Sequence, residues 1–415
     1  MKEERSIVEI GILGGGIAGL SVALALHKQG YKPRVYERRA VPTTMGAGMT
    51  LWPNASFVLD ELGLLQDVEA IAGRPLTVRR QDPAGNALGG LDIGLLDRAM
   101  GYPTYTVLRR HLQAVLLDHA ARAGIAVEFG RRVMDIELDA HGRAVAHFEN
   151  GPSIRPGLLI GADGRMGSVA RKFVAGDNTP IYQGFVNWVG VAQAPHALVD
   201  DVSIQDFWGM GERFGCVAIR SDLVYWAAAQ ARPLDKATPN EDMHEDVKQL
   251  FAHWPEPVSD IIQATPKSAI QLIAVHDLEP LHTWSRANVL LVGDAAHAPL
   301  PTSGQGACQA LEDAWHLARC LNGSSEDLKA VFQAFAKIRG PKTARLAEQG
   351  RFFARGLFST DPETCRIRNE RAKASDPTRD IQALAAAWGQ GLPMAGGTDS
   401  ASVKVDGFDS LYRIE

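Results

Sequence analysis

The feature that most constrains this chain is a strand, a glycine turn, a helix and a second strand, in that order, within residues 7–37. Ile7–Leu13 is the apolar run of a buried strand, Gly14, Gly16 and Gly19 give the spacing GxGxxG, and the second strand ends on Glu37. In such a unit the first glycine permits a tight turn, the second lets a pyrophosphate approach, and the third lets the helix pack on the strand. A glycine-rich turn without a ligand is the alternative, which the complete surrounding pattern disfavours. The sequence therefore predicts dinucleotide binding, with Glu37 placed to accept hydrogen bonds from an adenosine ribose.

Two later segments also read as buried strands that end on an acidic residue. Leu158–Ile160 leads to Asp163, and Val289–Val292 leads to Asp294. A loop rich in proline and glycine follows the second acid, and a helix is expected from about Ala307. Because helix amino termini favour anionic groups, this second segment predicts a site for a polar, partly anionic ligand.

Two further features leave their alternatives open. Gly48 and Met49 lie in a small-residue loop that suggests backbone against a flat ligand, although an ordinary loop with Asn54 capping the next helix fits almost as well. Arg109 and Arg110 fall in the first turn of an expected helix, where a cation opposes the helix dipole. One of them is expected to have an anionic partner, and simple solvation is an equal alternative.

The order of patterns predicts an α/β fold. We expect a Rossmann-like dinucleotide-binding domain with an inserted, largely antiparallel sheet domain and C-terminal helices. The short strands at 127–129, 132–138 and 144–149 are typical of a small meander. Helical periodicity continues to about residue 356 and fades after Thr360. The expected boundaries are 1–180 for the first part of the dinucleotide domain, 181–280 for the inserted sheet, 281–356 for the return and helices, and 357–415 for a tail of unknown role.

Composition and absent motifs narrow the function. A formal net charge of -5 argues against nucleic-acid binding. The sequence contains no apolar run of 18 or more residues, so a membrane span is not expected. Four cysteines without CxxC spacing, and a start without a signal-peptide pattern, favour the cytoplasm. The histidines show no metal-ligand spacing, and no GxSxG nucleophile elbow occurs. We therefore expect no metal, and a cofactor must supply the difficult chemistry.

Three motifs in order resemble the class A FAD-dependent monooxygenases, the aromatic hydroxylase family. They are GGGIAG with Glu37, GADG at Gly161–Gly164, and GDAAH with PTSGQG at Gly293–Gly306, within a resemblance that covers about residues 7–355. The resemblance implies FAD on the βαβ unit and a small aromatic or heteroaromatic substrate under the middle sheet. It also implies NADPH or NADH as a transient co-substrate, and hydroxylation by O2 through a flavin C4a-hydroperoxide.

Carried over position by position, the resemblance implies roles for the motif residues. Glu37 would accept from the ribose, Asp294 would accept from the ribityl chain, and Asp163 would link FAD contacts to nicotinamide use. The backbone around Gly306 and Cys308 would face the flavin pyrimidine. The full set of expected cofactor contacts is Gly14, Gly16, Ala18, Gly19, Glu37, Arg38, Gly48, Met49, Arg109, Val133, Asp163, Asp294, Gly304, Gly306, Ala307 and Cys308.

The substrate side is carried by residues of the middle sheet. The spacing of Asn187, Arg213 and Tyr225 resembles the urate hydroxylase branch of the family, and salicylate hydroxylase-like and epoxidase-like branches show similar patterns. Asn187, Arg213, Tyr225 and Pro301 are the expected substrate contacts, with Arg213 and Tyr225 as catalytic candidates that hold or deprotonate an acidic ring. The alternative is that Arg213 is paired structurally and Tyr225 belongs to the core.

Two other functions stay open at this stage. One is a flavin-dependent reductase or dehydrogenase of an isoprenoid or polyketide substrate on the same scaffold. The other is a non-catalytic FAD-binding protein. The substrate, the choice between NADH and NADPH, and the choice between monomer and homodimer are not determined by these patterns.

Overall fold

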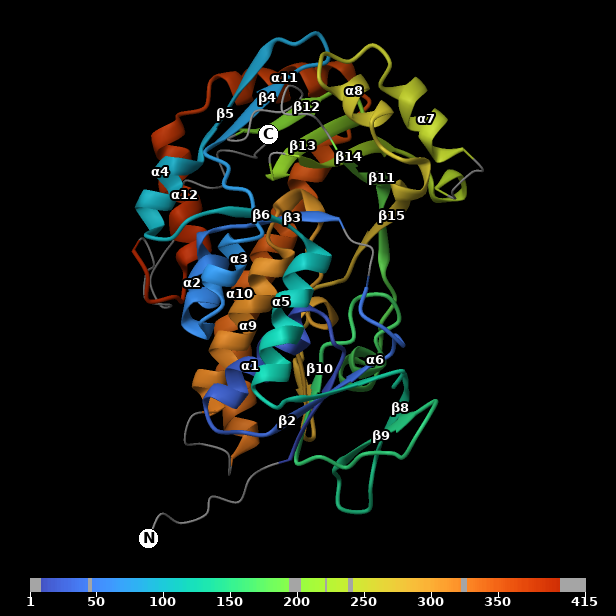
Figure 1. The fold of residues 1–415 in the computed structure, drawn as a ribbon, viewed down its shortest axis with the longest axis vertical. Coiled ribbons are helices and arrows are strands. Elements are labelled where there is room, and N and C mark those ends of the chain that lie inside the picture. Colours follow the sequence, from blue (N-terminus) through green and yellow to red (C-terminus); the bar gives the residue numbers. More distant parts are fainter. Residues whose placement is uncertain are drawn as a thin grey trace.

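The computed structural model describes residues 9–43, 47–193, 203–220, 222–237, 242–321 and 327–395. Figure 1 shows a six-stranded sheet with its helices at one end of an elongated molecule and a seven-stranded sheet at the other end. Within the described ranges, no helix has both the length and the apolar character that crossing a bilayer requires. The predicted α/β class with an inserted sheet is confirmed.

The six-stranded sheet builds the dinucleotide-binding half. Its strands are, in sheet order, β16 (Ser285–Arg286), β17 (Val289–Leu291), β10 (Leu158–Gly161), β1 (Ile10–Leu13), β2 (Pro33–Glu37) and β7 (Ala126–Phe129). All neighbouring pairs are parallel except β16 with β17. The carboxyl ends of parallel strands share one edge of a sheet, so the turns after β1, β10 and β17 meet there.

The seven-stranded sheet is largely antiparallel, as predicted. Its strands are, in sheet order, β15 (Gln271–Asp277), β11 (Ile181–Gln193), β14 (Leu223–Ala231), β13 (Glu212–Arg220), β12 (Ser203–Trp208), β4 (Thr77–Gln81) and β5 (Ala87–Asp92). The β4–β5 hairpin comes from the first quarter of the chain and joins this sheet through a parallel pairing of β4 with β12. Two pairs lie apart, β3 (Gly48–Leu51) with β6 (Tyr105–Leu108), and β8 (Val133–Leu138) with β9 (Ala144–Phe148).

Helices cover both sheets. They are α1 (Ile17–Lys28), α2 (Pro53–Leu62), α3 (Leu65–Glu69), α4 (Ile93–Met100), α5 (Arg109–Arg122), α6 (Val169–Ala175), α7 (Met243–Leu250), α8 (Val258–Gln263), α9 (Gly306–Leu321), α10 (Leu328–Leu357), α11 (Pro362–Lys373) and α12 (Pro377–Gly389). Residues of α7 and α8 pack on one face of the seven-stranded sheet around Trp188, Phe214 and Trp226. The opposite face packs against the C-terminal end of α10, through Ala354 and Leu357, and against Leu108 of β6.

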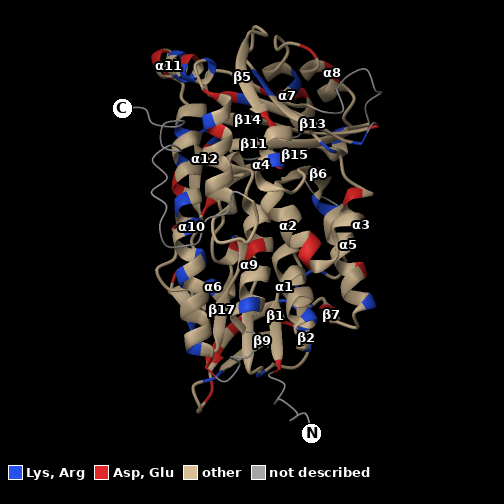
Figure 2. Cartoon of the chain, turned by 90° about the vertical axis from the view of Figure 1, so that its left-hand side faces the viewer, with Lys and Arg blue, Asp and Glu red and all other residues tan. Residues whose placement is uncertain are grey.

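The structure corrects the prediction for the segment after Thr360. Two helices, α11 and α12, follow α10, and Ile381, Leu384 and Trp388 of α12 are buried in the same cluster as residues of α2 and α4. Each helix begins with an aspartate cap followed by proline, which is a start signal. Figure 2 shows acidic and basic residues side by side on α11, and this charge concealed its helical periodicity. Residues 396–415 of the expected tail lie outside the described ranges.

The expected three-stranded meander is also wrong. β8 and β9 form a hairpin, but β7 pairs in parallel with β2 and extends the six-stranded sheet. Helix α5 immediately precedes β7, and a helical connection lets a strand join a sheet in parallel, as β7 does beside β2.

Candidate active site

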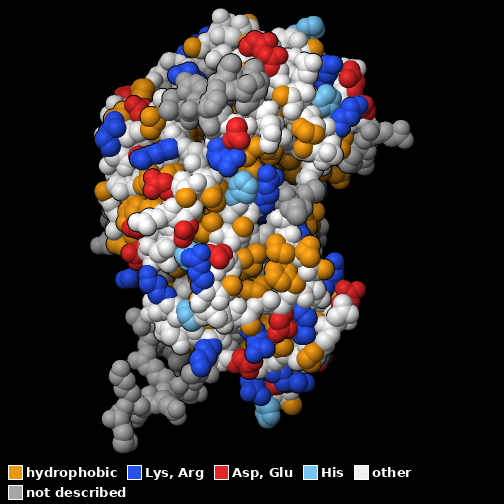
Figure 3. Space-filling model, in the orientation of Figure 1, with side chains coloured by type: hydrophobic (Ala, Val, Ile, Leu, Met, Phe, Trp, Pro, Cys, Tyr) orange, Lys and Arg blue, Asp and Glu red, His pale blue; other side chains and the backbone are white. Residues whose placement is uncertain are grey.

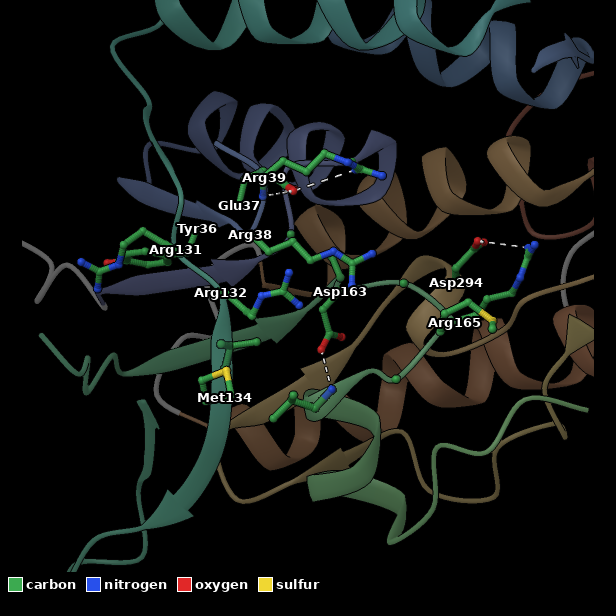
Figure 4. Close-up of a pocket in the computed structure, with 18 of the residues that line it drawn as sticks. Tyr36, Glu37, Arg38, Arg39, Arg131, Arg132, Met134, Asp163, Arg165 and Asp294 are labelled. Atoms are coloured by element: carbon green, nitrogen blue, oxygen red, sulfur yellow. Dashed lines mark hydrogen bonds and ion pairs between the residues drawn. The ribbon is translucent and has the colours of Figure 1, made fainter. Parts of the chain in front are cut away.

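A cavity of about 430 Å³ opens at the carboxyl edge of the six-stranded sheet (Figure 4). The turn after β1, the end of β2, the start of α5, the start of β8 and the loops after β10 and β17 all contribute to it. Eight of the predicted cofactor residues line it, namely Gly14, Gly16, Glu37, Arg38, Arg109, Val133, Asp163 and Asp294. Segments far apart in sequence therefore meet at one cavity, and they include residues that the family resemblance implied as cofactor contacts.

The three glycines of the GxGxxG turn differ in what surrounds them. Gly14 has a φ of +110°, and a Cβ added there would lie 2.3 Å from the carbonyl oxygen of Ala162. A Cβ at Gly19 would lie 1.9 Å from the carbonyl oxygen of Gly14. Apart from Gly16 and its two chain neighbours, no described residue has an atom within 4 Å of a Cβ built on Gly16. Two glycines are needed for packing, and Gly16 leaves open backbone at a cavity suited to a pyrophosphate.

Glu37 is buried at the end of β2, with 5% of its surface exposed. Its Oε2 accepts a hydrogen bond from the Gly15 amide at 2.7 Å, and its Oε1 accepts one from the Arg39 amide at 2.9 Å. Each carboxylate oxygen has a second lone-pair site. The loop thus fixes Glu37 and leaves acceptor capacity on its carboxylate for a ligand.

The two other carboxylates at this edge have different surroundings. Asp163 accepts hydrogen bonds from the Ser168 hydroxyl and from the Val169 amide, the latter at 2.7 Å, and so caps the start of α6. Burial raises the pKa of Asp163, and these hydrogen bonds oppose that rise. Asp294 is more open, with 38% of its side chain exposed and its Oδ2 at 3.8 Å from Nη1 of Arg165. Asp294 is therefore free to accept from a ligand, whereas Asp163 chiefly shapes the loop.

The cavity carries an excess of positive charge. Six arginines line it, together with the three carboxylates: Arg38, Arg39, Arg109, Arg131, Arg132 and Arg165. Arg131 stacks on Phe148, with 4.4 Å from its guanidinium carbon to the ring centroid. Arg109 lines this cavity, so an anionic ligand bound there would lie close to it, and the expected anionic partner of Arg109 stays a prediction. Figure 3 shows acidic and basic side chains interspersed on the viewed face rather than segregated by sign.

Of the other predicted cofactor residues, two lie in α1 and two in β3, and four lie at or just before the start of α9, namely Ala18 and Gly19, Gly48 and Met49, and Gly304, Gly306, Ala307 and Cys308. Gly293, the neighbour of Asp294, packs on Ala18, since a Cβ at Gly293 would lie 2.5 Å from that of Ala18. Farther along, Gly304 has a φ of +63° and abuts the Trp52 indole. Amide groups in the first turn of a helix have no intrahelical acceptor, so those of Gly306 and Ala307 can donate to a ligand.

Cys308 is buried in the first turn of α9, and its thiol donates to the Thr50 carbonyl oxygen at 3.7 Å. Burial raises the pKa of this thiol to about 12, so it stays protonated and unreactive. Its neighbour β3 reaches the other sheet, because a Cβ at Gly48 would lie 2.4 Å from Cγ of Tyr225. Gly48 and Met49 thus lie between the start of α9 and the seven-stranded sheet.

Three of the four predicted substrate residues, Asn187, Arg213 and Tyr225, share one face of the seven-stranded sheet. Ala229 of β14 pairs with Asn187 of β11 on one side and with Arg213 of β13 on the other, and paired residues project to the same face. Tyr225 lies four residues before Ala229 and so also projects to this face. Pro301 is exposed at the start of a 3₁₀ turn.

The electrostatics of this face decide what Arg213 and Tyr225 can do. Nε of Arg213 donates to Oδ1 of Asp206 at 2.6 Å, while 28% of the Arg213 side chain stays exposed. Burial raises the pKa of Tyr225 to about 12, against the lowering effect of Arg213. The phenol is therefore protonated at neutral pH and can donate a hydrogen bond, which makes a role as base unfavourable.

Sequence reasoning missed two groups of residues at the site. Asp206 lies in a segment where polar and apolar residues alternate as in an ordinary strand, so nothing in the sequence marked it as functional. A buried ionic cluster beneath α9 was missed as well, comprising Glu312, Asp313, Arg339, Lys342 and His297. It supports the site directly, because Oδ2 of Asp313 accepts a hydrogen bond from the Gly293 amide at 2.7 Å. Asn54, considered as a helix cap, instead donates to Glu312 and Gln305.

Comparison with known proteins agrees with this geometry. The family model described as FAD binding domain matches residues 7–330. FAD-dependent urate hydroxylase of Klebsiella pneumoniae is 32% identical over 82% of this chain and 88% of its own length. 3-Amino-4-hydroxybenzoate 2-monooxygenase of Streptomyces cremeus is 30% identical over 94% of this chain and 97% of its own length. The crystal structure of Klebsiella pneumoniae HpxO complexed with FAD and uric acid matches with a TM-score of 0.83 and 29% identity, over 91% of this chain and 95% of that one.

Proposed function

The chain belongs to the FAD binding domain family, as a class A FAD-dependent monooxygenase of aromatic or heteroaromatic substrates, and on this premise we propose how its own residues serve the reaction. FAD, when bound, supplies the electron transfer and the oxygen activation that hydroxylation needs. The cradle at Gly14–Gly19, with Glu37 and Asp294, would hold it. NAD(P)H and O2 are the proposed co-substrates, and the cytoplasm is the proposed compartment, supported by four free cysteines.

The first-turn amides of α9 would stabilise negative charge on the flavin pyrimidine. A helix amino terminus favours a nearby anion by roughly 0.3–2 kcal/mol, without the reorganisation that solvent would require. Gly304 and Trp52 fix the approach to this turn, since Gly304 abuts the indole. The start of α9 would thus orient the reacting end of the cofactor.

The observation that carries the substrate proposal is the row Asn187, Ala229, Arg213 across three strands, with Tyr225 packed against Gly48. This row puts an amide and a guanidinium on the same sheet face as Tyr225, which contacts a segment predicted to lie along the flavin. Urate and 3-amino-4-hydroxybenzoate, named for two relatives, are both flat, acidic rings. We propose that Arg213 binds the acidic group of such a ring, that Tyr225 donates to it, and that Pro301 borders the site.

The test is Arg213→Ala in the FAD-loaded protein, with urate and 3-amino-4-hydroxybenzoate as probes. A charge-assisted hydrogen bond is worth about 1.5–3 kcal/mol, so the dissociation constant of the bound probe should rise about 10- to 150-fold with FAD content unchanged. Product is identified by mass spectrometry after turnover under ¹⁸O₂.

The matched control is Arg220→Ala, on the same strand, where the arginine is exposed and pairs only with Asp222 among the described side chains. Its probe affinity should stay within twofold of the unaltered protein. Loss of FAD from Arg213→Ala alone would show that Arg213 is structural, and incorporation of no ¹⁸O into either probe would count against both as substrates.

A further inference from the structure

Asp206 lies on β12, on the same sheet face as Arg213, and has no role in the function proposed above. It is buried, with 5% of its surface exposed. Both carboxylate oxygens are engaged, Oδ1 by Nε of Arg213 at 2.6 Å and Oδ2 by the Trp208 indole N–H at 2.8 Å. Because these donors fix it from two sides, its negative charge is held in one place beside the guanidinium that would meet the substrate.

The contact with Asp206 leaves one edge of that guanidinium available. A Cβ added to Gly215 would lie 3.9 Å from Nη2 of Arg213 and 3.9 Å from Oδ1 of Asp206, so the pair lies over a residue without a side chain. With Nε bonded to Asp206, the Nη1 and Nη2 groups form the remaining fork, which suits a carboxylate or an ionised ring amide.

The charges around Asp206 add up to a small net value. Arg80 pairs with Asp206 in the register of β4 and β12, and its guanidinium carbon lies 5.3 Å from the centre of the Trp208 ring. Arg368 lies 5.6 Å from the same ring, and Asp380 interacts with Arg80. Three arginines and two aspartates therefore leave one formal positive charge.

Asn187 adds a hydrogen-bonding requirement to this charge. Its Oδ1 is buried and has no hydrogen-bond partner among the residues that the structure describes. Strand spacing places the backbones of Asn187 and Arg213 roughly 10 Å apart, with Ala229 between them. A substituted aromatic ring has a comparable span, so that one substituent could donate to Asn187 while another accepts from Arg213.

Resting on the proposed function, we propose that Asp206 is a specificity-determining residue that sets the site for a monoanionic ring bearing an N–H or O–H donor. Asp206 positions the open fork of Arg213 and cancels one arginine charge. A neutral ring leaves the remaining positive charge uncompensated, and a dianion exceeds it.

The test measures binding to the FAD-loaded protein from the change in flavin absorbance, with three probes that share a phenol group. These are salicylamide, salicylate and 4-hydroxyisophthalate, which are neutral, monoanionic and dianionic at neutral pH. The unaltered protein should bind salicylate most tightly. In Asp206→Asn, affinity for the dianion relative to salicylate should rise at least about tenfold, because one nearby negative charge is lost.

A second variant tests the same charge balance with the opposite sign. Arg80→Gln should raise the affinity for salicylamide relative to salicylate, and it keeps the proposal testable if Asp206→Asn does not fold. Asp222→Asn is the matched control, because Asp222 pairs with Arg220 at an exposed turn of the same sheet. Its affinity ratios should stay unchanged.

The possible results separate the two proposals. Binding of the probes with unchanged ratios in Asp206→Asn or Arg80→Gln would overturn the role of Asp206 and leave the proposed function standing. A weaker affinity for all three probes to the same degree would show a purely structural role. No response of the flavin to any probe would count against the aromatic site itself, and hence against both proposals.

Discussion

At the scale of single residues, the glycine turn offers a test of the cofactor assignment that does not depend on turnover. Gly16 has open space where its side chain would be, whereas Gly14 is enclosed by Ala162 and has a left-handed backbone. Gly16→Ala should therefore change the free energy of unfolding of the FAD-free protein by less than about 1 kcal/mol while weakening FAD binding at least tenfold. Gly14→Ala should lower stability by about 1–3 kcal/mol even without FAD. Denaturant titration and FAD titration measure both effects, and unchanged FAD affinity in Gly16→Ala would contradict the assignment.

The same contrast explains which site residues the sequence could predict. Gly14, Glu37 and Asp294 belong to local strand–turn–helix patterns, and the physics of such turns is written in adjacent residues. Asp206 depends on the pairing of β12 with β13, which no local pattern encodes. Its ion pair with Arg213 therefore became visible only with the sheet register in place.

At the scale of elements, α9 and α10 are joined by a buried ionic cluster that should make stability depend on pH. Burial alone raises the pKa of Asp313, but contacts with His297 and Arg339 lower it to about 2. A carboxyl with a lowered pKa in the folded state contributes stability above its unfolded value, near 4, and loses it as the pH falls towards 2. Asp313→Asn should cost about 3–5 kcal/mol at pH 7, because Arg339 loses a buried partner.

The measurement is urea unfolding of both proteins between pH 7 and pH 2, compared as a difference. That difference should shrink below about pH 4 as the unaltered protein loses its advantage. Asp118→Asn, at an exposed pair with Arg122, is the control and should change stability by less than about 0.5 kcal/mol. A difference independent of pH would show that the Asp313 charge is not what stabilises the fold.

Helices and strands were predictable where apolar residues repeat on one face, and less so where charged side chains are buried. Lys342 and Arg339 occupy positions in α10 that read as polar surface, yet both side chains are buried against Glu312. The α12 pattern was present in Ile381, Leu384 and Trp388, but it was not recognised from the sequence. Burial of these residues depends on a partner helix distant in sequence, which hydrophobic periodicity alone cannot supply.

At the scale of the whole molecule, the C-terminal helices bring α12 back to the proposed flavin site. Trp388 of α12 lies 4.8 Å from Trp52 between ring centres, and Trp52 in turn abuts Gly304 before α9. Lys342 strengthens this link by donating to the Trp388 carbonyl oxygen at 2.7 Å as well as to Glu312. The C-terminal segment should therefore support cofactor binding and not only the fold.

Trp388→Ala and Trp254→Ala separate these two contributions, because both tryptophans are buried, and Trp254 lies in the core beneath the opposite face of the seven-stranded sheet. Each substitution should cost about 3–5 kcal/mol of unfolding free energy, measured with denaturant. Only Trp388→Ala should also weaken FAD binding, by about tenfold or more, since only it removes support from Trp52 and the start of α9. An equal loss of FAD affinity in both variants would mean that general destabilisation, rather than this contact, governs the site. Unchanged affinity in both would mean that α12 stabilises the fold alone, and that the first-turn amides of α9 are held in place by Asp313 and the rest of the ionic cluster.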